Sequence, residues 1–320
     1  MDYLMRLIGI NHNRLFTIAG ECDIRIEKLL VARQFMKQLL IRTMREGDLD
    51  FAAGCTAAEG WLTETREEFE GFLDYDHQGC FIAEWEGRRA GICMAIRYGD
   101  KGHIGEMIVD REFRPKALGP LLFSRAIEYF HRHGCTSISL DAVPRAVSFY
   151  ESFGFREVCR SLRFYKKLTA FPSPWVRTIE VADISAVCLL DRQAFSADRS
   201  FFLHRRLAIY PDLANVHSKN GEIEGYIFGR RRGPIVWAGP WWVKENSECP
   251  EALLWSLAQK AADAEIQLGI LEFNTKAVAL VRSLGFEEKP HPSVRMVLGS
   301  IQGALGLDSD LYAIGTPAKG

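Results

Sequence analysis

The alternation of apolar and polar residues between positions 46 and 166 predicts a definite order of helices and strands. Spaced apolar residues with acidic caps over 46–72 predict helices. Short apolar runs at 80–85 and 90–98, joined by Glu86-Gly87-Arg88, predict a hairpin. The pattern then predicts a strand at 103–110, a helix at 118–133, a strand at 137–142, a short helix at 145–152 and a strand at 158–166. This order predicts an α+β domain with one central mixed sheet.

A second copy of the pattern follows the first. The segment Ile41-Arg42-Thr43-Met44 aligns with Val176-Arg177-Thr178-Ile179 at an offset of 135 residues. Further aligned pairs are Asp48 with Asp183, Gly105 with Gly239, Val109 with Val243, and Gly154-Phe155 with Gly285-Phe286, at offsets between 131 and 135. Because the offset drifts by so little, the chain is expected to contain two copies of one fold.

The repeat predicts two tandem domains, 36–168 and 176–320, with a linker over 169–175. The linker includes Phe171-Pro172-Ser173-Pro174, and proline pushes the residue before it into an extended conformation. Residues 1–35 have no counterpart in the second copy and are expected to form an N-terminal extension.

Composition and charge exclude several classes of protein. The chain has 48% hydrophobic and 25% charged residues, as ordinary globular domains do. Its 40 basic and 41 acidic residues give a net charge of −1, so nothing draws the whole chain to nucleic acid or to an anionic membrane. No apolar stretch approaches the length of a signal or a membrane span. We therefore expect a cytoplasmic protein that is a monomer or a homodimer and binds neither nucleic acid nor a membrane.

The cysteines are scattered singly and form no CxxC pair. Neither a zinc site nor a disulfide framework is indicated, and we expect reduced thiols and no metal.

Candidate chemistry is concentrated in residues 104–123. A strand ends at Val109, and Arg114-Pro115-Lys116-Ala117-Leu118-Gly119 then leads into a helix. Small residues let the backbone approach a ligand, and the free amides and dipole at a helix N-terminus form an anion site. Arg114 and Lys116 would add positive charge for a diphosphate. The alternative is an ordinary strand-to-helix turn with solvated basic residues.

A second signature lies at 144–155, where Tyr150 is followed by Gly154-Phe155. With Arg114, Ala117 and Gly119 of the loop, it resembles the GNAT superfamily of acyl-CoA-dependent N-acetyltransferases. The tandem arrangement resembles a two-domain subgroup with a degenerate second domain. The resemblance implies that each copy has a central mixed β-sheet flanked by helices, and that acetyl-CoA is the co-substrate.

The resemblance also implies roles for individual residues. Acetyl-CoA would be held by Met107, Ile108, Val109, Arg114, Pro115, Lys116, Ala117, Leu118 and Gly119. Tyr150 would protonate the departing thiolate. Glu106 would deprotonate the acceptor amine through a water, or else is an exposed strand charge. The acceptor, an amine of a small molecule or protein, is not identified.

Departures from the family pattern keep a second function open. Ala117 stands where glycine is usual and would be strained at a positive φ. Pro115 and Pro120 each remove an amide that could donate to phosphate. The alternative function is a non-catalytic acyl-CoA-binding sensor or scaffold.

The second copy departs further. No glycine precedes its helix at 251, and Val281 occupies the position of Tyr150. We expect it to be non-catalytic and to complete a joint sheet or wall the acceptor pocket. Trp241, Trp242 and Tyr226 are candidates to line that pocket, with core packing as the alternative.

Overall fold

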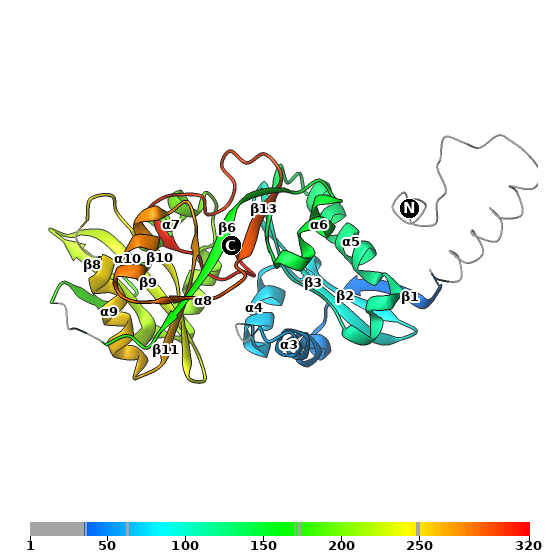
Figure 1. Ribbon diagram of the computed structural model, residues 1–320, viewed down its shortest axis with the longest axis horizontal. Coiled ribbons are helices and arrows are strands. Elements are labelled where there is room, and N and C mark those ends of the chain that lie inside the picture. Colours follow the sequence, from blue (N-terminus) through cyan, green and yellow to red (C-terminus); the bar gives the residue numbers. More distant parts are fainter. Residues whose placement is uncertain (1–34, 36, 62–63, 170, 172–173, 248–249) are drawn as a thin grey trace, which may run out of the picture. The chain divides into compact units, whose positions relative to one another are not determined.

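The computed structural model describes residue 35 and residues 37–320, apart from 62–63, 170, 172–173 and 248–249 (Figure 1). The expected N-terminal extension lies outside the described residues, except for its last residue. The α-helices are α3 (Leu49–Ala58), α4 (Arg66–Asp76), α5 (Leu118–Arg132), α6 (Val147–Glu151), α7 (Ile184–Phe195), α8 (Ser200–Ile209), α9 (Pro250–Ala261) and α10 (Thr275–Ser283). Short 3-10 helices are η1 (Glu46–Asp48), η2 (His77–Gly79), η3 (Arg111–Lys116), η4 (Pro144–Ala146) and η5 (Pro211–Leu213).

The strands are β1 (Leu39–Thr43), β2 (Cys80–Trp85), β3 (Arg88–Tyr98), β4 (Lys101–Val109), β5 (Ser137–Ala142), β6 (Arg156–Lys166), β7 (Val176–Thr178), β8 (Ala214–Lys219), β9 (Glu222–Arg232), β10 (Ile235–Val243), β11 (Glu265–Leu271), β12 (Glu287–Glu288), β13 (Ser293–Gly299) and β14 (Leu311–Ala313). The expected order of elements over 46–166, and the α+β class, are confirmed.

The described chain divides into two compact units. The first holds the residues up to Ala95 together with Glu106–Arg132, and the second holds Ile96–Gly105 and His133–Gly320. Strands β3 and β4 therefore contribute residues to both units. The units are defined by packing, and they cut across the two sequence copies.

In the first unit, β2 pairs antiparallel with both β1 and β3. The β2–β3 hairpin turns at Glu86 and Gly87, which both have positive φ, as a tight hairpin turn requires. Helix α5 packs on β2, where the Phe81 and Tyr129 rings meet edge to face with centroids 6.1 Å apart. Gly91 of β3 lies so close to β4 that a Cβ there would stand 2.7 Å from the carbonyl oxygen of Ile108. Glycine at this position allows β3 and β4 to meet.

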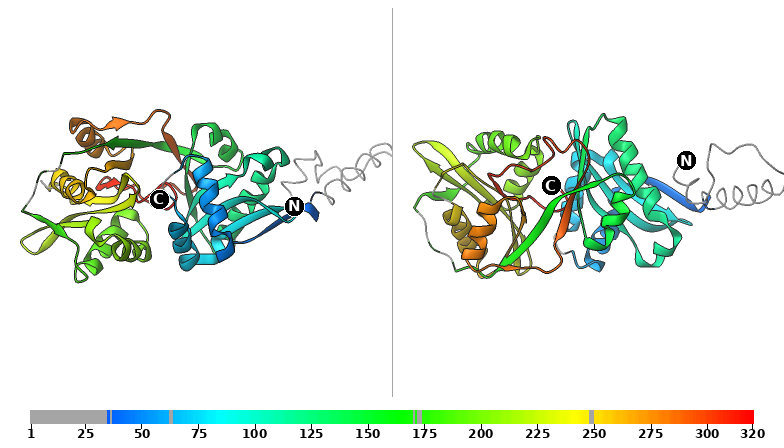
Figure 2. Two further views of the ribbon diagram at one scale, coloured as in Figure 1. Left: turned by 90° about the horizontal axis from the view of Figure 1, so that it is seen from below. Right: turned by 45° about the horizontal axis from the view of Figure 1, so that its top comes forward.

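In the second unit, the last strands of the two copies are exchanged. Strand β6 ends the first copy and pairs with β11 of the second, from Ser161↔Leu271 to Lys166↔Ile266. Strand β13 ends the second copy and pairs with β5 of the first. The resulting order is β5-β13-β6-β11-β10-β9-β8-β7. The right-hand view of Figure 2 shows β6, in green, beside β13, in orange. The expectation that the second copy completes a joint sheet is confirmed.

An ion pair marks the start of each copy and explains part of the repeat. Arg42 donates to both carboxylate oxygens of Asp48, at 2.6 and 3.0 Å. Arg177 donates to both oxygens of Asp183 in the same way, at 2.6 and 2.8 Å. A bidentate pair of this kind requires arginine and a carboxylate, which accounts for the matching residues.

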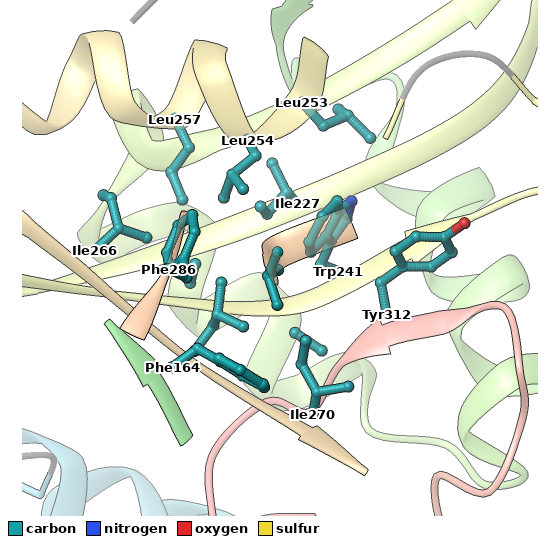
Figure 3. Close-up of a cluster of buried hydrophobic side chains, with 14 of the residues drawn as sticks. Phe164, Ile227, Trp241, Leu253, Leu254, Leu257, Ile266, Ile270, Phe286 and Tyr312 are labelled. Atoms are coloured by element: carbon teal, nitrogen blue, oxygen red, sulfur yellow. The ribbon is translucent and has the colours of Figure 1, made fainter. Parts of the chain in front are cut away.

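The aromatic residues proposed to line a pocket are core residues. Trp241 is fully buried with Leu253, Leu254 and Phe286 in the cluster that α9 covers (Figure 3). Tyr226 and Trp242 stack in a neighbouring cluster, with ring centroids 5.9 Å apart and planes 21° apart. The core-packing alternative is therefore confirmed for these side chains.

Across the described residues, no helix is long and apolar enough to cross a membrane. The free cysteines of the same part of the chain include Cys80 and Cys93, which are buried. Burial raises the pKa of both thiols, so they stay protonated and unreactive at neutral pH.

Candidate active site

The ladder between β4 and its parallel neighbour β5 covers only the first part of β4. The two strands pair from Lys101↔Ser137 to Ile104↔Leu140, and the ladder ends there. Glu106 then has a φ of 48°, in the left-handed region that glycine favours. Strand β4 nevertheless continues to Val109. The main chain of Met107–Val109 is thus outside the β4–β5 ladder, at an edge where an extended ligand could pair.

Glu106 itself is buried. Its exposed fraction is 7%, so the alternative of an exposed strand charge is wrong. A non-glycine residue with positive φ is strained, and such strain is concentrated at functional sites. A poorly hydrated carboxylate is also a strong hydrogen-bond acceptor. These properties suit a group that takes up a proton.

The turn after β4 is more ordered than the sequence indicates. The Asp110 side chain accepts a hydrogen bond from the amide of Glu112 at 3.1 Å, and the 3-10 helix η3 follows. Phe113 anchors this helix in the first unit, with 4% of its surface exposed. Ala117 ends it with φ 54° and ψ 34°. The conformation that would strain alanine at this position is therefore present.

The N-terminus of α5 adjoins the end of β4. A Cβ built on Gly119 would lie 3.8 Å from Cγ2 of Val109 and 3.9 Å from Cε of Met107. The amides in the first turn of a helix have no partner within it. In α5 they belong to Leu118, Gly119 and Leu121, since Pro120 has none. These amides and the helix dipole favour an anion beside Gly119.

The basic side chains of the loop already have partners. Arg114 donates from Nη2 to Oε1 of Glu59 at 2.5 Å, and from Nε to the carbonyl oxygen of Val109 at 3.0 Å. Lys116 places its Nζ over the Trp85 ring, 5.4 Å from the centroid. Burial favours the neutral form of Glu59, but the hydrogen bond and charge of Arg114 outweigh it and hold the pKa of Glu59 below its ordinary value. Pro115, Lys116 and Arg114 are exposed, whereas Leu118 is buried.

Tyr150 belongs to the second unit and lies in α6. Its ring contacts those of Phe149 and Phe155, with centroids 5.1 and 6.2 Å away. The amide of Phe155 donates back to the carbonyl oxygen of Tyr150 at 3.2 Å, across Gly154, which has a φ of 89°. The Tyr-x-x-x-Gly-Phe spacing is thus a helix C-terminus closed by a left-handed glycine.

The second copy has the same glycine turn after its equivalent helix, α10, but it lacks the tyrosine hydroxyl. The amide of Phe286 donates to the carbonyl oxygen of Val281 at 3.0 Å, across Gly285 with a φ of 75°. Val281 is fully buried and offers no hydroxyl.

A buried polar cluster in the second unit was not identified from the sequence. Asp141 of β5 pairs with Arg295 of β13 at 2.6 Å and with Arg163 of β6 at 3.0 Å. Burial would raise the pKa of Asp141, but the charges of Arg295 and Arg163 lower it below its ordinary value. Nearby, His103 contacts the Ser139 hydroxyl at 3.0 Å, and burial lowers the pKa of His103 to about 4. In the sequence, only the polar residues of the short strand β5 pointed to this cluster. Arg295 could not be recognised as a member, because it reaches Asp141 through the strand exchange.

Within the part of the chain that the structure describes, no group of three or more His, Cys, Asp or Glu side chains could hold a metal ion.

Comparison with protein families finds two matches in tandem. Residues 37–155 match the model of the acetyltransferase (GNAT) family, and residues 187–312 match a second model described as an acetyltransferase (GNAT) domain. Together they cover most of the chain.

Individual relatives are more distant. The chain is 30% identical over 101 residues to N-alpha-acetyltransferase 30 of Dictyostelium discoideum, a match that covers 29% of this chain and 55% of the relative. The chain spans about half or less of the length of the first curated relatives it matches.

Two solved structures share the fold over most of the chain. One, from Pyrococcus horikoshii, has a TM-score of 0.74 at 23% identity and covers 88% of this chain and 96% of its own. The other is a tandem GNAT protein from the clavulanic acid biosynthesis pathway, with a TM-score of 0.56 at 13% identity, covering 82% and 98%.

Proposed function

Because the chain belongs to the GNAT acetyltransferase superfamily and carries two GNAT domains in tandem, we propose that it transfers an acetyl group from acetyl-CoA to an amine, with the first copy holding the co-substrate. The observation that carries this proposal is the meeting of two elements in the first unit. The segment Met107–Val109, which lies beyond the β4–β5 ladder, ends beside Gly119, at the N-terminus of α5.

The residues present fit such a ligand. The edge of β4 can pair with an amide-containing arm as with an extra strand. The amides of Leu118, Gly119 and Leu121 can donate to a phosphate, and the missing side chain of Gly119 leaves room for it. Acetyl-CoA supplies an acetyl group activated as a thioester.

Two side chains are proposed to move protons. Glu106, buried on the kinked part of β4, would accept a proton from the acceptor ammonium through a water. Tyr150, in α6, would donate its phenolic proton to the departing thiolate. An amide of Met107–Val109 would polarise the acetyl carbonyl. The role of Tyr150 rests on the family resemblance.

The class of amine stays open between a small molecule and a protein. The matched relatives include an N-alpha-acetyltransferase and a glucosamine 6-phosphate N-acetyltransferase, so their names favour neither.

Two observations motivate the alternative of a non-catalytic acyl-CoA sensor or scaffold. Arg114 is engaged by Glu59, and Pro120 removes a first-turn donor, so the site offers fewer phosphate contacts than the motif suggests.

A two-part experiment tests the proposal. Calorimetric titration with acetyl-CoA should show saturable binding in the micromolar range, and a panel of amines should include one whose acetylation releases free CoA thiol. No binding at high micromolar acetyl-CoA would refute the proposal. Binding without transfer to any amine, or slow hydrolysis only, would favour the sensor.

A further inference from the structure

The ladder between β10 and β11 in the second copy ends at the same point as the equivalent ladder in the first copy. Strands β10 and β11 pair from Ile235↔Glu265 to Ala238↔Leu268, and Gly239 follows with a φ of 147°. In the first copy, β4 and β5 end their ladder at Ile104, and Gly105 follows. The offset of 134 residues that aligns Gly105 with Gly239 also aligns Met107–Val109 with Trp241–Val243. In each copy the ladder between the equivalent strands therefore ends at the same point, and in the second copy this leaves a groove between β10 and β11.

In the second copy a segment of the chain itself fills this groove. Strand β14 pairs antiparallel with β10, with Trp241 opposite Ala313 and Trp242 opposite Leu311. On the other side, the amide of Ile314 donates to the carbonyl oxygen of Gly269, in β11, at 3.0 Å. We refer to residues 310–314 as the plug segment. It joins the two strands at the point where they separate.

The plug segment is closely fitted. A Cβ on Gly239 would lie 2.1 Å from the carbonyl oxygen of Ile314, so a larger residue could not stand there. Ala313 and Ile314 are buried. Tyr312 packs on the Trp241 ring with centroids 5.0 Å apart, as Figure 3 shows.

Asn274 holds the plug segment from the side. Its Nδ2 donates to the carbonyl oxygens of Ser309 and Leu311, at 2.7 and 3.0 Å. Its Oδ1 accepts from the amide of Ala277 at 2.9 Å and caps α10. One side chain thus ties the plug segment to the helix that follows β11.

We propose that the plug segment replaces, in the second copy, the ligand arm that the first copy would bind, so that the chain takes up one acetyl-CoA and takes it in the first copy. The proposal rests on the proposed function for the identity of the ligand. A pantetheine arm and a peptide segment use the same kind of strand-edge hydrogen bonds, and one groove has room for one of them. The amide of Val243, equivalent to Val109, already donates to the carbonyl oxygen of Asp310 at 3.0 Å.

Filling the groove also fixes the residues that follow. A Cβ on Gly105 would lie 2.4 Å from the carbonyl oxygen of Ala318. The Pro317 carbonyl oxygen lies 2.8 Å from Nε2 of His103. Gly105 immediately precedes Glu106. The plug segment is thus followed directly by residues that pack on β4 at Gly105 and His103.

Titration calorimetry and hydrogen exchange on the full chain test the proposal, with acetyl-CoA as the probe. We expect a stoichiometry of one, slower exchange at Met107–Val109 on binding, and amides of Val243 and Ile314 that exchange slowly with or without acetyl-CoA. A stoichiometry of two would overturn the proposal while leaving the proposed function intact. So would slower exchange at Trp241–Val243, or release of the plug segment, on binding.

If acetyl-CoA does not bind at all, the proposed function fails, and exchange in the unliganded chain still decides the inference. Slow exchange at Val243 and Ile314 supports a filled groove, and fast exchange overturns it.

Asn274→Asp tests the anchor, because the carboxylate keeps the α10 cap but cannot donate to Ser309 and Leu311. We expect the Ile314 amide to exchange at least about tenfold faster. Ser309→Ala, at an exposed position, is the matched control and should leave the rate unchanged. An unchanged rate in Asn274→Asp would show that these hydrogen bonds do not hold the plug segment in place.

Discussion

Arg114 donates from Nη2 to Oε1 of Glu59 at 2.5 Å, although the two residues are 55 positions apart. The arginine is partly exposed, whereas the Glu59 side chain has only 6% of its surface exposed. A diphosphate approaching α5 would therefore compete with Glu59 for the same guanidinium.

The first prediction is that Glu59→Gln strengthens acetyl-CoA binding. The amide keeps the shape of the carboxylate but releases the charge of Arg114. Because the Arg114 end of the pair is exposed to solvent, the pair contributes about 1 kcal/mol, and the dissociation constant should fall by roughly two- to fivefold in a calorimetric titration. Glu112→Gln, which breaks the exposed pair with Arg88, is the control and should have no effect. Weaker binding in Glu59→Gln would show that Glu59 orients Arg114 rather than competing for it.

The second prediction concerns Gly119, which the fold does not require. A methyl group there would make only ordinary contacts with Val109 and Met107. Gly119→Ala should therefore leave the free energy of unfolding unchanged or raise it by about 0.5–1 kcal/mol, because alanine favours helix. If a ligand phosphate uses this space, acetyl-CoA binding should weaken by about tenfold or more.

The control for Gly119→Ala is Gly54→Ala in α3, where a Cβ meets nothing within 4 Å. It should give a similar gain in stability without any change in acetyl-CoA binding. Unchanged binding in both variants would place the ligand elsewhere.

The third prediction is that Ala117→Gly stabilises the protein. Alanine at a φ of 54° carries a steric cost of roughly 1–2 kcal/mol, which glycine avoids while losing more conformational freedom on folding. The net gain in the free energy of unfolding should be about 0.5–1 kcal/mol, measured by urea denaturation. Ser196→Gly, at the left-handed end of α7, should give a comparable gain. A loss of stability at Ala117 would mean that its methyl group makes contacts worth more than the strain.

Local elements could be predicted from the sequence because each depends on neighbouring residues. The turn at Glu86-Gly87 and the amphipathic helix α5 depend on residues that are close together in the sequence. The family pattern also drew attention to Ala117, which has the positive φ that strains alanine. The partner of Arg114 could not be predicted in this way. Glu59 directly follows α3, far away in the chain, and many arrangements of charged side chains fit the same pattern.

The exchange of strands β6 and β13 could not be predicted from the sequence, for a different reason. Two copies of one fold have similar apolar strands, so β6 and β13 satisfy the same burial pattern in either copy. The buried pair of Asp141 with Arg295 distinguishes the two arrangements, because Arg295 of the second copy finds its buried carboxylate on β5 of the first copy. Neither residue indicated this alone.

The fourth prediction is that Glu106→Gln lowers kcat by about 100-fold or more, since the amide cannot accept a proton. The change keeps the shape of a buried side chain, so acetyl-CoA affinity should change little. Measured kcat against pH should lose its acidic limb if the carboxylate is the base. A proportional loss of kcat and acetyl-CoA affinity would instead indicate that Glu106 supports the kink of β4, with no part in proton transfer.

The last prediction is a pH dependence of stability that originates at His103. Its imidazole has an ordinary pKa of 6.5, and burial lowers it to about 4 in the folded protein. Between these values the unfolded chain binds a proton that the folded chain does not, so the free energy of unfolding falls as the pH drops from 6.5 to 4, by on the order of 3 kcal/mol. Asp141, whose pKa is also lowered, contributes only below its ordinary value of 3.8.

His103→Gln separates this effect from the rest, because its amide nitrogen can still donate to the carbonyl oxygen of Pro317, the acceptor of the Nε2 proton. Urea denaturation at a series of pH values should show a flatter dependence between pH 6.5 and 4 than in the unmodified protein. His217→Gln is the comparison, since burial lowers the pKa of His217 as well, while the nearby charge of Glu224 opposes this shift. If the slope of His103→Gln matches that of the unmodified protein, His103 is protonated in the fold, and the contact with Ser139 must then be a donation from the imidazolium.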